Sequence, residues 1–490
     1  MSVHRSRVAV RLTSHPVRRH DGMSAYLALA ERFGVDEVHL LESAAGPATD
    51  IRYQYTGFGT LLTLSVTRDV VRIEGLPALR NLVTARLLPL LDQSGPQPRL
   101  RRSTDLWAVL RAARECFDVR GSEEVFKFGF LGYLGYDTAR YIERLPYLIE
   151  SDDSLPDVHL VLTRGWVVTD LTAGTSELLL HDADLWPSVD PAELVPLLSD
   201  ADTTHPVPEP GPATPALHIG DDTTRAEYLS TVDKCLSYIA MGEIYQVQIG
   251  HELIVRSEVD PLDVYLRLRR RNPSPYMYLT SLDGHRVVGA SPELFVRVEN
   301  GLVTMRPIAG TIPRGRTDDE TAGRILSSDA KEIAEHVMLV DLCRNDIGRI
   351  CQRDTLDVPD QLVVERFSHV LHLVSTVVGQ AEPGKDAWDI IAALFPAGTM
   401  TGTPKVRAME IIEEMEQSRR GIYAGALGLI DVDGYVNLAL CIRTLVHHDG
   451  AYRIRASAGV VADSVGESEW TETMAKAGAA YWAATGTELL

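Results

Sequence analysis

Two pairs of glutamates have the spacing that brings carboxylates onto one face of a helix. Glu332 and Glu335 lie in DAKEIAEHVMLVDLCRND, and Glu469 and Glu472 lie in GESEWTETMAKAG, with Lys476 one turn further on. Residues three or four apart are neighbours on a helix surface. Two such helices facing each other would therefore build a cage of oxygen ligands suited to Mg²⁺. The alternative is that each pair is an ordinary solvated helix face, which is the commoner case for one motif alone.

Three further residues have side chains that could take part in catalysis or anion binding. His372 lies in the strand-like run RFSHVLHLVSTVV, where it is either a hydrogen-bonded core residue or an acid, base or ligand. Arg443 ends the apolar run LALCIRTLV, and a buried arginine needs an anionic partner. Glu293 follows a proline in ASPELF, where an ordinary turn carboxylate is the alternative. No serine-hydrolase, cysteine–histidine or dinucleotide-binding motif accompanies them.

The stretch from Phe395 to Gly421, FPAGTMTGTPKVRAMEIIEEMEQSRRG, predicts a glycine- and threonine-rich loop followed by a helix. Thr403 suits the N-cap and Pro404 the first helical position. Free N–H groups at the start of such a helix favour an anionic ligand. The stretch is not a Walker A motif, because no Gly-Lys-Ser/Thr follows the first glycine at the required distance. Taken alone, it would equally be a surface turn before an amphipathic helix.

Composition excludes several classes of protein. The chain has 490 residues and a net charge of −20, which argues against a general nucleic-acid binder or a polybasic membrane anchor. Five scattered cysteines without a C-x-x-C pair indicate a reduced protein without a zinc site. The basic N-terminus lacks the apolar core of a signal peptide, and no apolar run reaches the length of a membrane span. We therefore expect a cytoplasmic protein.

The order of predicted elements favours an α+β fold. Residues 1–200 contain many short strand patterns, and residues 217–490 mix strands with helices in blocks rather than in strict alternation. Between them, residues 201–216 read ADTTHPVPEPGPATPA, with five prolines. Because proline at this density prevents regular structure, we predict a linker between an N-terminal and a C-terminal region.

Taken together, the motifs resemble the chorismate-utilising enzymes, and most closely the large subunit (component I) of anthranilate synthase. The resemblance covers about residues 220–480. It rests on GEIYQVQ (242–248), NPSPYMYL (272–279), GASPELF (289–295), RPIAGTIPRG (306–315), DAKEIAEHVMLVDLCRND (329–346), VLHLVS (370–375), the 395–412 stretch, GIYAGALG (421–428), CIRT (441–444) and AGVVADSVGESEWTET (458–473). LLES (40–43), RYQYTG (52–57) and FLGYLGYD (130–137) extend it weakly to the N-terminal half. It implies two antiparallel sheets packed face to face, with helices outside.

The resemblance also implies roles for individual residues. Glu335 and Glu472 would hold Mg²⁺, with Glu332 and Glu469 alongside. The ion would bind the ring carboxylate of chorismate.

The remaining roles concern the substrate. Lys476 and the backbone near Gly459 would assist the ion, while Tyr423 and Arg443 would hold the enolpyruvyl carboxylate. Thr311 and Thr399 would line the pocket. Glu293 would protonate the departing 4-hydroxyl, and His372 would take part in eliminating pyruvate.

Three positions discriminate between reactions within this family. Members that add water carry a lysine where this chain has Gln246, so ammonia is the expected nucleophile. Ala309 replaces the lysine typical of 4-amino-4-deoxychorismate synthases, which favours attack by ammonia at C2. His372 favours the full reaction. We therefore expect Mg²⁺-dependent formation of anthranilate with loss of pyruvate, a lyase step of tryptophan or anthranilate-derived biosynthesis. The alternative is a 2-amino-2-deoxyisochorismate or 4-amino-4-deoxychorismate synthase.

Partners and regulation follow from the same resemblance. Ammonia would come from a separate glutaminase subunit. Ser43 in LLES, with Pro275 and Met277 in NPSPYM, resembles a feedback pocket for tryptophan. Two departures from the family pattern stand out: TGTPK replaces SGAPK, and Ser457 stands where a glycine is common. A non-catalytic paralogue and a solute-binding protein are the alternatives from other classes. The filled catalytic positions argue against the first, and the missing export signal against the second.

Overall fold

Two long antiparallel strands form the spine of the molecule. The computed structural model describes residues 7–120, 125–151, 155–315 and 317–490. The spine strands β3 (Tyr53–Thr67) and β9 (Val158–Asp170) pair along almost their whole length. Both are rich in the β-branched and aromatic residues that fit a pleated sheet. Beyond β9 the sheet continues, in spatial order, through β10 (Thr175–Asp182), β1 (Val8–Val17) and β7 (Phe117–Arg120). Beyond β3 it continues through β4 (Val70–Gly75), β6 (Arg99–Leu100) and β5 (Leu91–Asp92).

Two arms of the sheet leave the spine on opposite sides. The arm next to β3 contains, in spatial order, β2 (Val38–Glu42), β13 (Tyr276–Leu282), β14 (His285–Ser291), β23 (Thr444–His448), β24 (Ala451–Val460) and β12 (Gln246–Arg256), and it ends in β11 (His218–Asp221) and β20 (Gly402–Thr403). The arm next to β9 contains β8 (Gly129–Leu134), β21 (Ala426–Asp431), β22 (Val436–Leu440), β15 (Leu294–Glu299), β16 (Leu302–Met305) and β19 (Val370–Gln380), flanked by β17 (Ile308–Pro313) and β18 (Asp357–Arg366).

The two arms pack face to face over an apolar core. Tyr133 and Leu427 from the second arm meet Tyr278 and Val446 from the first in one buried cluster. Because the spine joins the arms, all of these strands belong to one hydrogen-bonded network. The predicted α+β fold with two packed antiparallel sheets is therefore confirmed.

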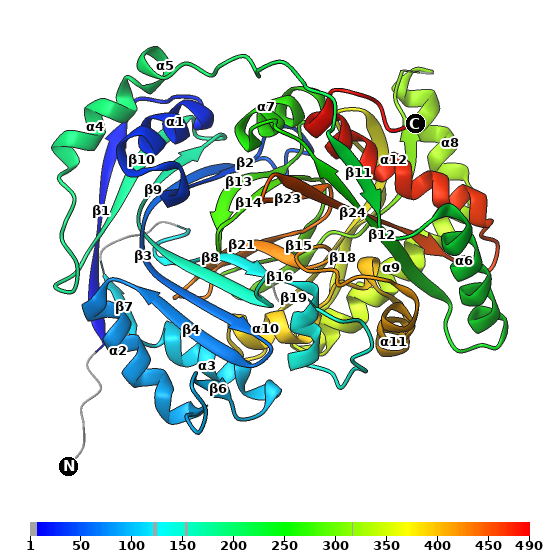
Figure 1. The fold of residues 1–490 in the computed structure, drawn as a ribbon, viewed down its shortest axis with the longest axis horizontal. Helices are drawn as coiled ribbons and strands as arrows, with labels where there is room; N and C mark the ends of the chain where they lie inside the picture. Colours follow the sequence, from blue (N-terminus) through cyan, green and yellow to red (C-terminus); the bar gives the residue numbers. More distant parts are fainter. Residues whose placement is uncertain (1–6, 121–124, 152–154, 316) are drawn as a thin grey trace.

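Helices cover the outer faces of both arms (Figure 1). Apolar side chains of α1 (Gly22–Phe33), α7 (Pro261–Arg271) and α12 (Gly466–Thr485) pack onto the first arm, near α4 (Pro191–Ser199) and α5 (Ala201–Thr204). The second core includes α2 (Pro77–Leu87), α3 (Leu106–Arg114), α6 (Arg225–Ala240), α9 (Ala330–Gly348), α10 (Ala387–Leu394) and α11 (Lys405–Met415), while α8 (Asp319–Ser328) covers β17 and β19.

The predicted domains share the sheet. Strand β2 of the N-terminal region pairs with β13, and β8 pairs with β21, so strands from both sides of the proline-rich stretch lie side by side. Within that stretch, residues 201–204 form α5, and residues 206–216 have no regular structure. The boundaries 1–200, 201–216 and 217–490 stay a prediction.

One local prediction is wrong. Helix α11 begins at Lys405, so Pro404 is its N-cap rather than its first helical residue, and Thr403 lies outside it. The backbone of Thr403 instead pairs with Gln246 at the start of β12, and its carbonyl accepts a hydrogen bond from the Tyr245 N–H at 2.8 Å. Pairing with β12 thus outweighs the local preference of threonine for an N-cap position.

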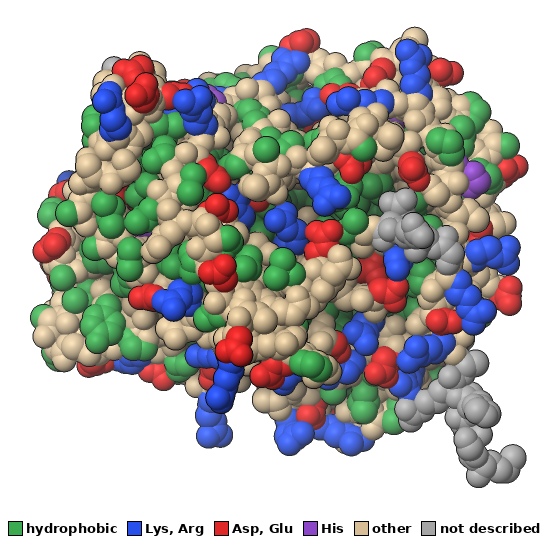
Figure 2. Space-filling model, turned by 180° about the vertical axis from the view of Figure 1, so that it is seen from behind, with side chains coloured by type: hydrophobic (Ala, Val, Ile, Leu, Met, Phe, Trp, Pro, Cys, Tyr) green, Lys and Arg blue, Asp and Glu red, His purple; other side chains and the backbone are tan. Residues whose placement is uncertain are grey.

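The surface carries charges of both signs. Figure 2 shows acidic and basic side chains interspersed over the face that it presents, rather than one basic patch. Within the described residues, no helix is long and apolar enough to cross a membrane.

Candidate active site

Helices α9 and α12 bring the four predicted metal ligands together. Burial raises the pKa of Glu335, and the charges of Glu332, Glu472 and Glu469 raise it further. Burial and the charge of Glu472 likewise raise the pKa of Glu332. The two carboxylates of α9 thus interact with carboxylates of the facing helix α12. Neutralising such a cluster requires cations.

The protein itself supplies two cations at the edge of this cluster. Lys331 lies 3.7 Å from the Glu335 carboxylate, and Lys476 lies 2.5 Å from that of Glu472. No three of the four carboxylates place oxygens within 4.8 Å of one another in the part of the chain that the structure describes. Burial raises the pKa of Glu332, Glu335 and Glu469. Together with Glu472 they offer hard oxygen donors that suit a divalent cation of the Mg²⁺ type.

Gly310, on β17, gives this cluster room. Its φ of +75° lies in the region that glycine tolerates, and a Cβ there would stand 3.1 Å from the Glu332 carboxylate. A side chain at this position would therefore both strain the backbone and press on a predicted metal ligand.

Lys476 connects the carboxylate cluster to β24. Its ammonium donates a hydrogen bond of 2.9 Å to the carbonyl of Ser457. Two residues further along β24 is Gly459, where a Cβ would stand 2.8 Å from the Gln246 side-chain nitrogen and 2.9 Å from that of Gln248. The missing side chain thus leaves space for two amide groups beside the lysine.

Arg443 and Tyr423 also lie at this site. Arg443 has a φ of +52°, and its guanidinium donates to the carbonyl of Lys476 at 2.8 Å. Burial lowers its pKa, while the nearby Tyr423 and Glu472 raise it. The Tyr423 ring is buried, and its hydroxyl lies 2.7 Å from that of Ser457.

Glu293 is a buried acid in the middle of the site. Its carboxylate accepts a hydrogen bond of 3.2 Å from the hydroxyl of Thr399. Burial raises its pKa to about 8, although Thr399 and the charge of Lys476 oppose the shift. Near neutral pH the group therefore carries a proton that it can donate.

His372, on β19, faces the same space with a neutral ring. Its Nδ1 lies 3.0 Å from the carbonyl of Gly310 and 3.1 Å from the hydroxyl of Thr311, the residue opposite it on β17. Burial lowers its pKa to about 4, and the charges of Arg443 and Lys476 lower it further. Ala309 lies on β17, opposite Leu373 of β19.

Ion pairs and hydrogen bonds hold the loop before α11 in place. The Lys405 ammonium lies 2.7 Å from the buried carboxylate of Asp346. Binding of an anion by the free N–H groups at the start of α11 stays a prediction. Arg420, fully buried, donates both to the carbonyl of Met400 and to that of Gln248, at 2.8 Å each. It thereby ties the loop that carries Thr399 to strand β12. Its charge is balanced by Glu416 at 2.7 Å.

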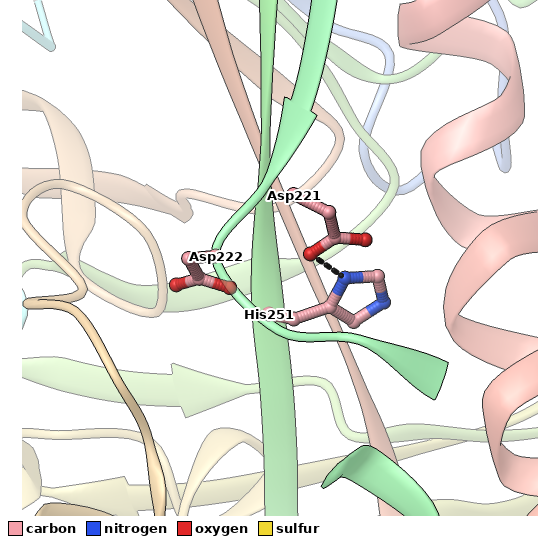
Figure 3. Close-up of side chains that lie close together, drawn as sticks. All are labelled: Asp221, Asp222 and His251. Carbon is pink, nitrogen blue, oxygen red and sulfur yellow. Dashed lines mark hydrogen bonds and ion pairs between the residues drawn. The ribbon is translucent and has the colours of Figure 1, made fainter. Parts of the chain in front are cut away.

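Residues beyond those predicted support the site. Within the described residues, one group of potential metal ligands is tight: Asp221, Asp222 and His251 (Figure 3). Both His251 nitrogens already have partners, Asp221 at 2.9 Å and Thr473 on α12 at 2.8 Å. Asp222 accepts from the Glu252 N–H instead. The group therefore fastens α12, and with it two of the metal-ligand candidates, to β12.

The predicted feedback residues lie together, away from the carboxylate cluster. Ser43, Pro275 and Met277 line a cavity of about 40 Å³ where β2 pairs with β13. The Ser43 hydroxyl donates to the carbonyl of Tyr53 at 3.1 Å. Binding of tryptophan there stays a prediction.

Comparison with known proteins places this site in a family. Residues 90–481 match the model for chorismate binding enzymes. A 2-amino-4-deoxychorismate synthase of Streptomyces globisporus is 62% identical over 485 residues, covering 99% of this chain and 98% of that protein. Anthranilate synthase component 1 of Pseudomonas putida is 35% identical over 474 residues, covering 93% and 90%. Among solved structures, anthranilate synthase component I from Streptococcus pneumoniae TIGR4 matches with a TM-score of 0.70 at 30% identity, covering 88% of this chain and 92% of that one.

These comparisons overturn the expectation that the product is anthranilate. The relative at 62% identity is a 2-amino-4-deoxychorismate synthase, whereas the anthranilate synthase components are 35–42% identical. The expectation depended on the presence of His372. Its depressed pKa shows why presence is a weak argument, since a neutral imidazole is a poor proton donor at neutral pH. The match over residues 90–481 nevertheless establishes that this chain belongs to the chorismate binding enzyme family.

Proposed function

We propose that this protein is a 2-amino-4-deoxychorismate synthase, which aminates chorismate at C2 with ammonia and keeps the enolpyruvyl group. The observation that carries the proposal is the 62% identity, over 99% of the chain, to a synthase of that name. An amino group at C2, a lost 4-hydroxyl and a retained enolpyruvyl group also describe 2-amino-2-deoxyisochorismate. The proposal is thus the C2 alternative that the sequence left open. Synthases of 4-amino-4-deoxychorismate typically have a lysine where this chain has Ala309, which argues against the 4-amino product.

Substrate binding would use the charged groups around the carboxylate cluster. Glu335 and Glu472, with Glu332 and Glu469 beside them, would hold Mg²⁺. When bound, that ion neutralises the cluster and attracts the ring carboxylate of chorismate. Lys476 would share that carboxylate.

The second carboxylate of chorismate, on the enolpyruvyl group, would lie near Arg443. This guanidinium is buried and hydrogen-bonded to the Lys476 carbonyl, so it is held in place for an anion. A dianionic substrate approaching a chain of charge −20 needs such focused cations, because the field of the whole protein repels it.

The amination balances with Glu293 as the acid. The lone pair of ammonia forms the C2–N bond, the ring double bonds shift by one position, and the C4–O bond breaks. The departing oxygen takes the proton of Glu293 and leaves as water. The carboxylate is reprotonated when the new ammonium group at C2 loses its proton to solvent. A carboxyl pKa of about 8 favours this role, since the acid form prevails near neutral pH.

The ammonia would come from a separate glutaminase subunit. Release of ammonia from glutamine uses a cysteine nucleophile in many enzymes. The five cysteines in the described residues of this chain are all buried, which does not suit that role. Gln246 begins β12 beside Gly459 and would face the incoming ammonia, as a neutral side chain that does not deprotonate water.

Product analysis tests the proposal directly. Purified protein is incubated with chorismate, Mg²⁺ and ammonium near pH 8, where the acid form of Glu293 and free ammonia are both present, and products are separated and identified by mass. We expect an aminated product that retains the enolpyruvyl carbons, with no release of pyruvate. Reactions without ammonium and without Mg²⁺ are the controls. Formation of pyruvate in step with chorismate consumption would reject the proposal.

A further inference from the structure

Ser457 occupies the centre of the hydrogen bonds that hold the substrate-binding side chains. It lies on β24 opposite Gly250 of β12 and is 1% exposed. Opposed residues of paired strands share a face, so its side chain lies on the face that carries Gln248 and Gly459. The Ser457 hydroxyl is 2.7 Å from that of Tyr423 and 3.0 Å from the Gln248 side-chain oxygen.

The direction of these two hydrogen bonds follows from counting protons. The Gln248 oxygen can only accept, so the single proton of the Ser457 hydroxyl is donated to it. The contact between Ser457 and Tyr423 then needs the other proton, and Tyr423 must be its donor. The phenol proton is therefore directed at the serine and away from any ligand.

Backbone atoms of the same residue hold a second group. The carbonyl of Ser457 accepts from the Lys476 ammonium at 2.9 Å, and the Lys476 carbonyl accepts from Arg443 at 2.8 Å. Replacing only the Ser457 side chain would leave both of these bonds intact. The hydroxyl can thus be tested apart from the backbone.

We propose that the Ser457 hydroxyl determines the product, by holding the Tyr423 proton away from the enolpyruvyl group. This inference rests on the proposed function. Loss of pyruvate requires a base to take the proton at C2, whose C–H electrons complete the aromatic ring. The C3–O bond breaks, and its electron pair leaves on the enolate of pyruvate, which must gain a proton. With the Tyr423 proton bound to Ser457, that proton has no donor at this position, and the reaction stops after amination.

The test measures the ratio of anthranilate plus pyruvate to the aminated product. Ser457→Ala removes the hydroxyl and keeps the backbone bond to Lys476, so we expect the ratio to rise by roughly 10² or more, the lower end of the range for general acid catalysis. Ser457→Thr is the matched control, because it keeps a hydroxyl on the same carbon and should keep the wild-type ratio. An unchanged ratio in the alanine variant, with chorismate still consumed, would overturn the inference.

Two further variants keep the test decisive if Ser457→Ala folds poorly. Gln248→Met removes the acceptor, which frees the serine proton and through it the tyrosine proton, and should also raise the ratio. Adding Tyr423→Phe to either variant should cancel the rise, as a double-mutant cycle would show. A rise that survives Tyr423→Phe would refute the route through that hydroxyl. If the wild type itself forms anthranilate, the proposed function fails. If only the variants fail to shift the ratio, the inference on Ser457 fails alone.

Discussion

Replacing Glu293 with glutamine should slow turnover and stabilise the fold at the same time. The buried acid has a pKa of about 8, raised by its desolvation, and the reaction needs its proton. Glutamine has almost the same shape and can still bond to Thr399, but it has no acidic proton. General acid catalysis typically contributes about 10²–10⁴ in rate. We therefore expect kcat to fall by at least about 10² in Glu293→Gln.

The gain in stability follows from proton linkage. An unfolded glutamate loses its proton near pH 4.5, whereas folded Glu293 keeps it until about pH 8. The folded state is thus favoured fully below pH 4.5 and loses that advantage as pH rises towards 8, by about 1.4 kcal/mol per pH unit. At pH 7 the loss amounts to about 3 kcal/mol, which the neutral glutamine avoids.

Two assays on the same variant check these expectations. Urea unfolding at pH 5 and at pH 7 should show the free-energy gain of Glu293→Gln growing with pH. Rates of the wild type, expressed per concentration of free NH₃, should fall as pH passes 8, because the acid form is lost while free ammonia is already accounted for. A variant that keeps turnover within a few-fold, or a stability gain independent of pH, would refute the reasoning.

Three further predictions concern the metal, the support of the site and its regulation. Glu335→Gln should require roughly tenfold or more Mg²⁺ for half-maximal rate, as expected when a ligand is weakened; an unchanged Mg²⁺ titration would exclude Glu335 as a ligand. Arg420→Met should lower the free energy of urea unfolding by about 1.5–3 kcal/mol, because Glu416 loses one of its two buried arginine partners and keeps Arg455 at 2.9 Å, and a loss below about 0.5 kcal/mol would contradict this. Tryptophan should lower the rate by binding where Ser43, Pro275 and Met277 line a cavity; an unchanged rate at millimolar tryptophan would contradict that prediction.

Some of the site was predictable because local periodicity and element type decide it. Glu332 with Glu335 and Glu469 with Glu472 needed only helical spacing, and both helices form where expected. The two packed sheets followed from the resemblance and are confirmed.

Other features depend on long-range pairing that no local pattern encodes. Thr403 is a strand residue because it pairs with β12. Lys405 forms an ion pair with Asp346, which lies 59 positions earlier in the chain. His251 looked like an unremarkable strand residue until the fold placed Asp221 and Thr473 at its two nitrogens.

The product was the hardest property to predict, because it depends on protonation and hydrogen-bond direction. The sequence shows that His372 is present, but only burial in the fold sets its pKa at about 4. Ser457 was visible as a departure from a glycine pattern. Its bonds to Tyr423 and Gln248 became apparent only once β24 and β12 were paired.

The most direct test of the account follows a single turnover of labelled substrates. The protein is mixed with chorismate, Mg²⁺ and ¹⁵N-ammonium, and the products are examined by NMR while pyruvate is measured in parallel. The account predicts nitrogen bonded to C2 of a ring that still carries the enolpyruvyl group, with no pyruvate. Labelled anthranilate accompanied by one pyruvate per chorismate would contradict it.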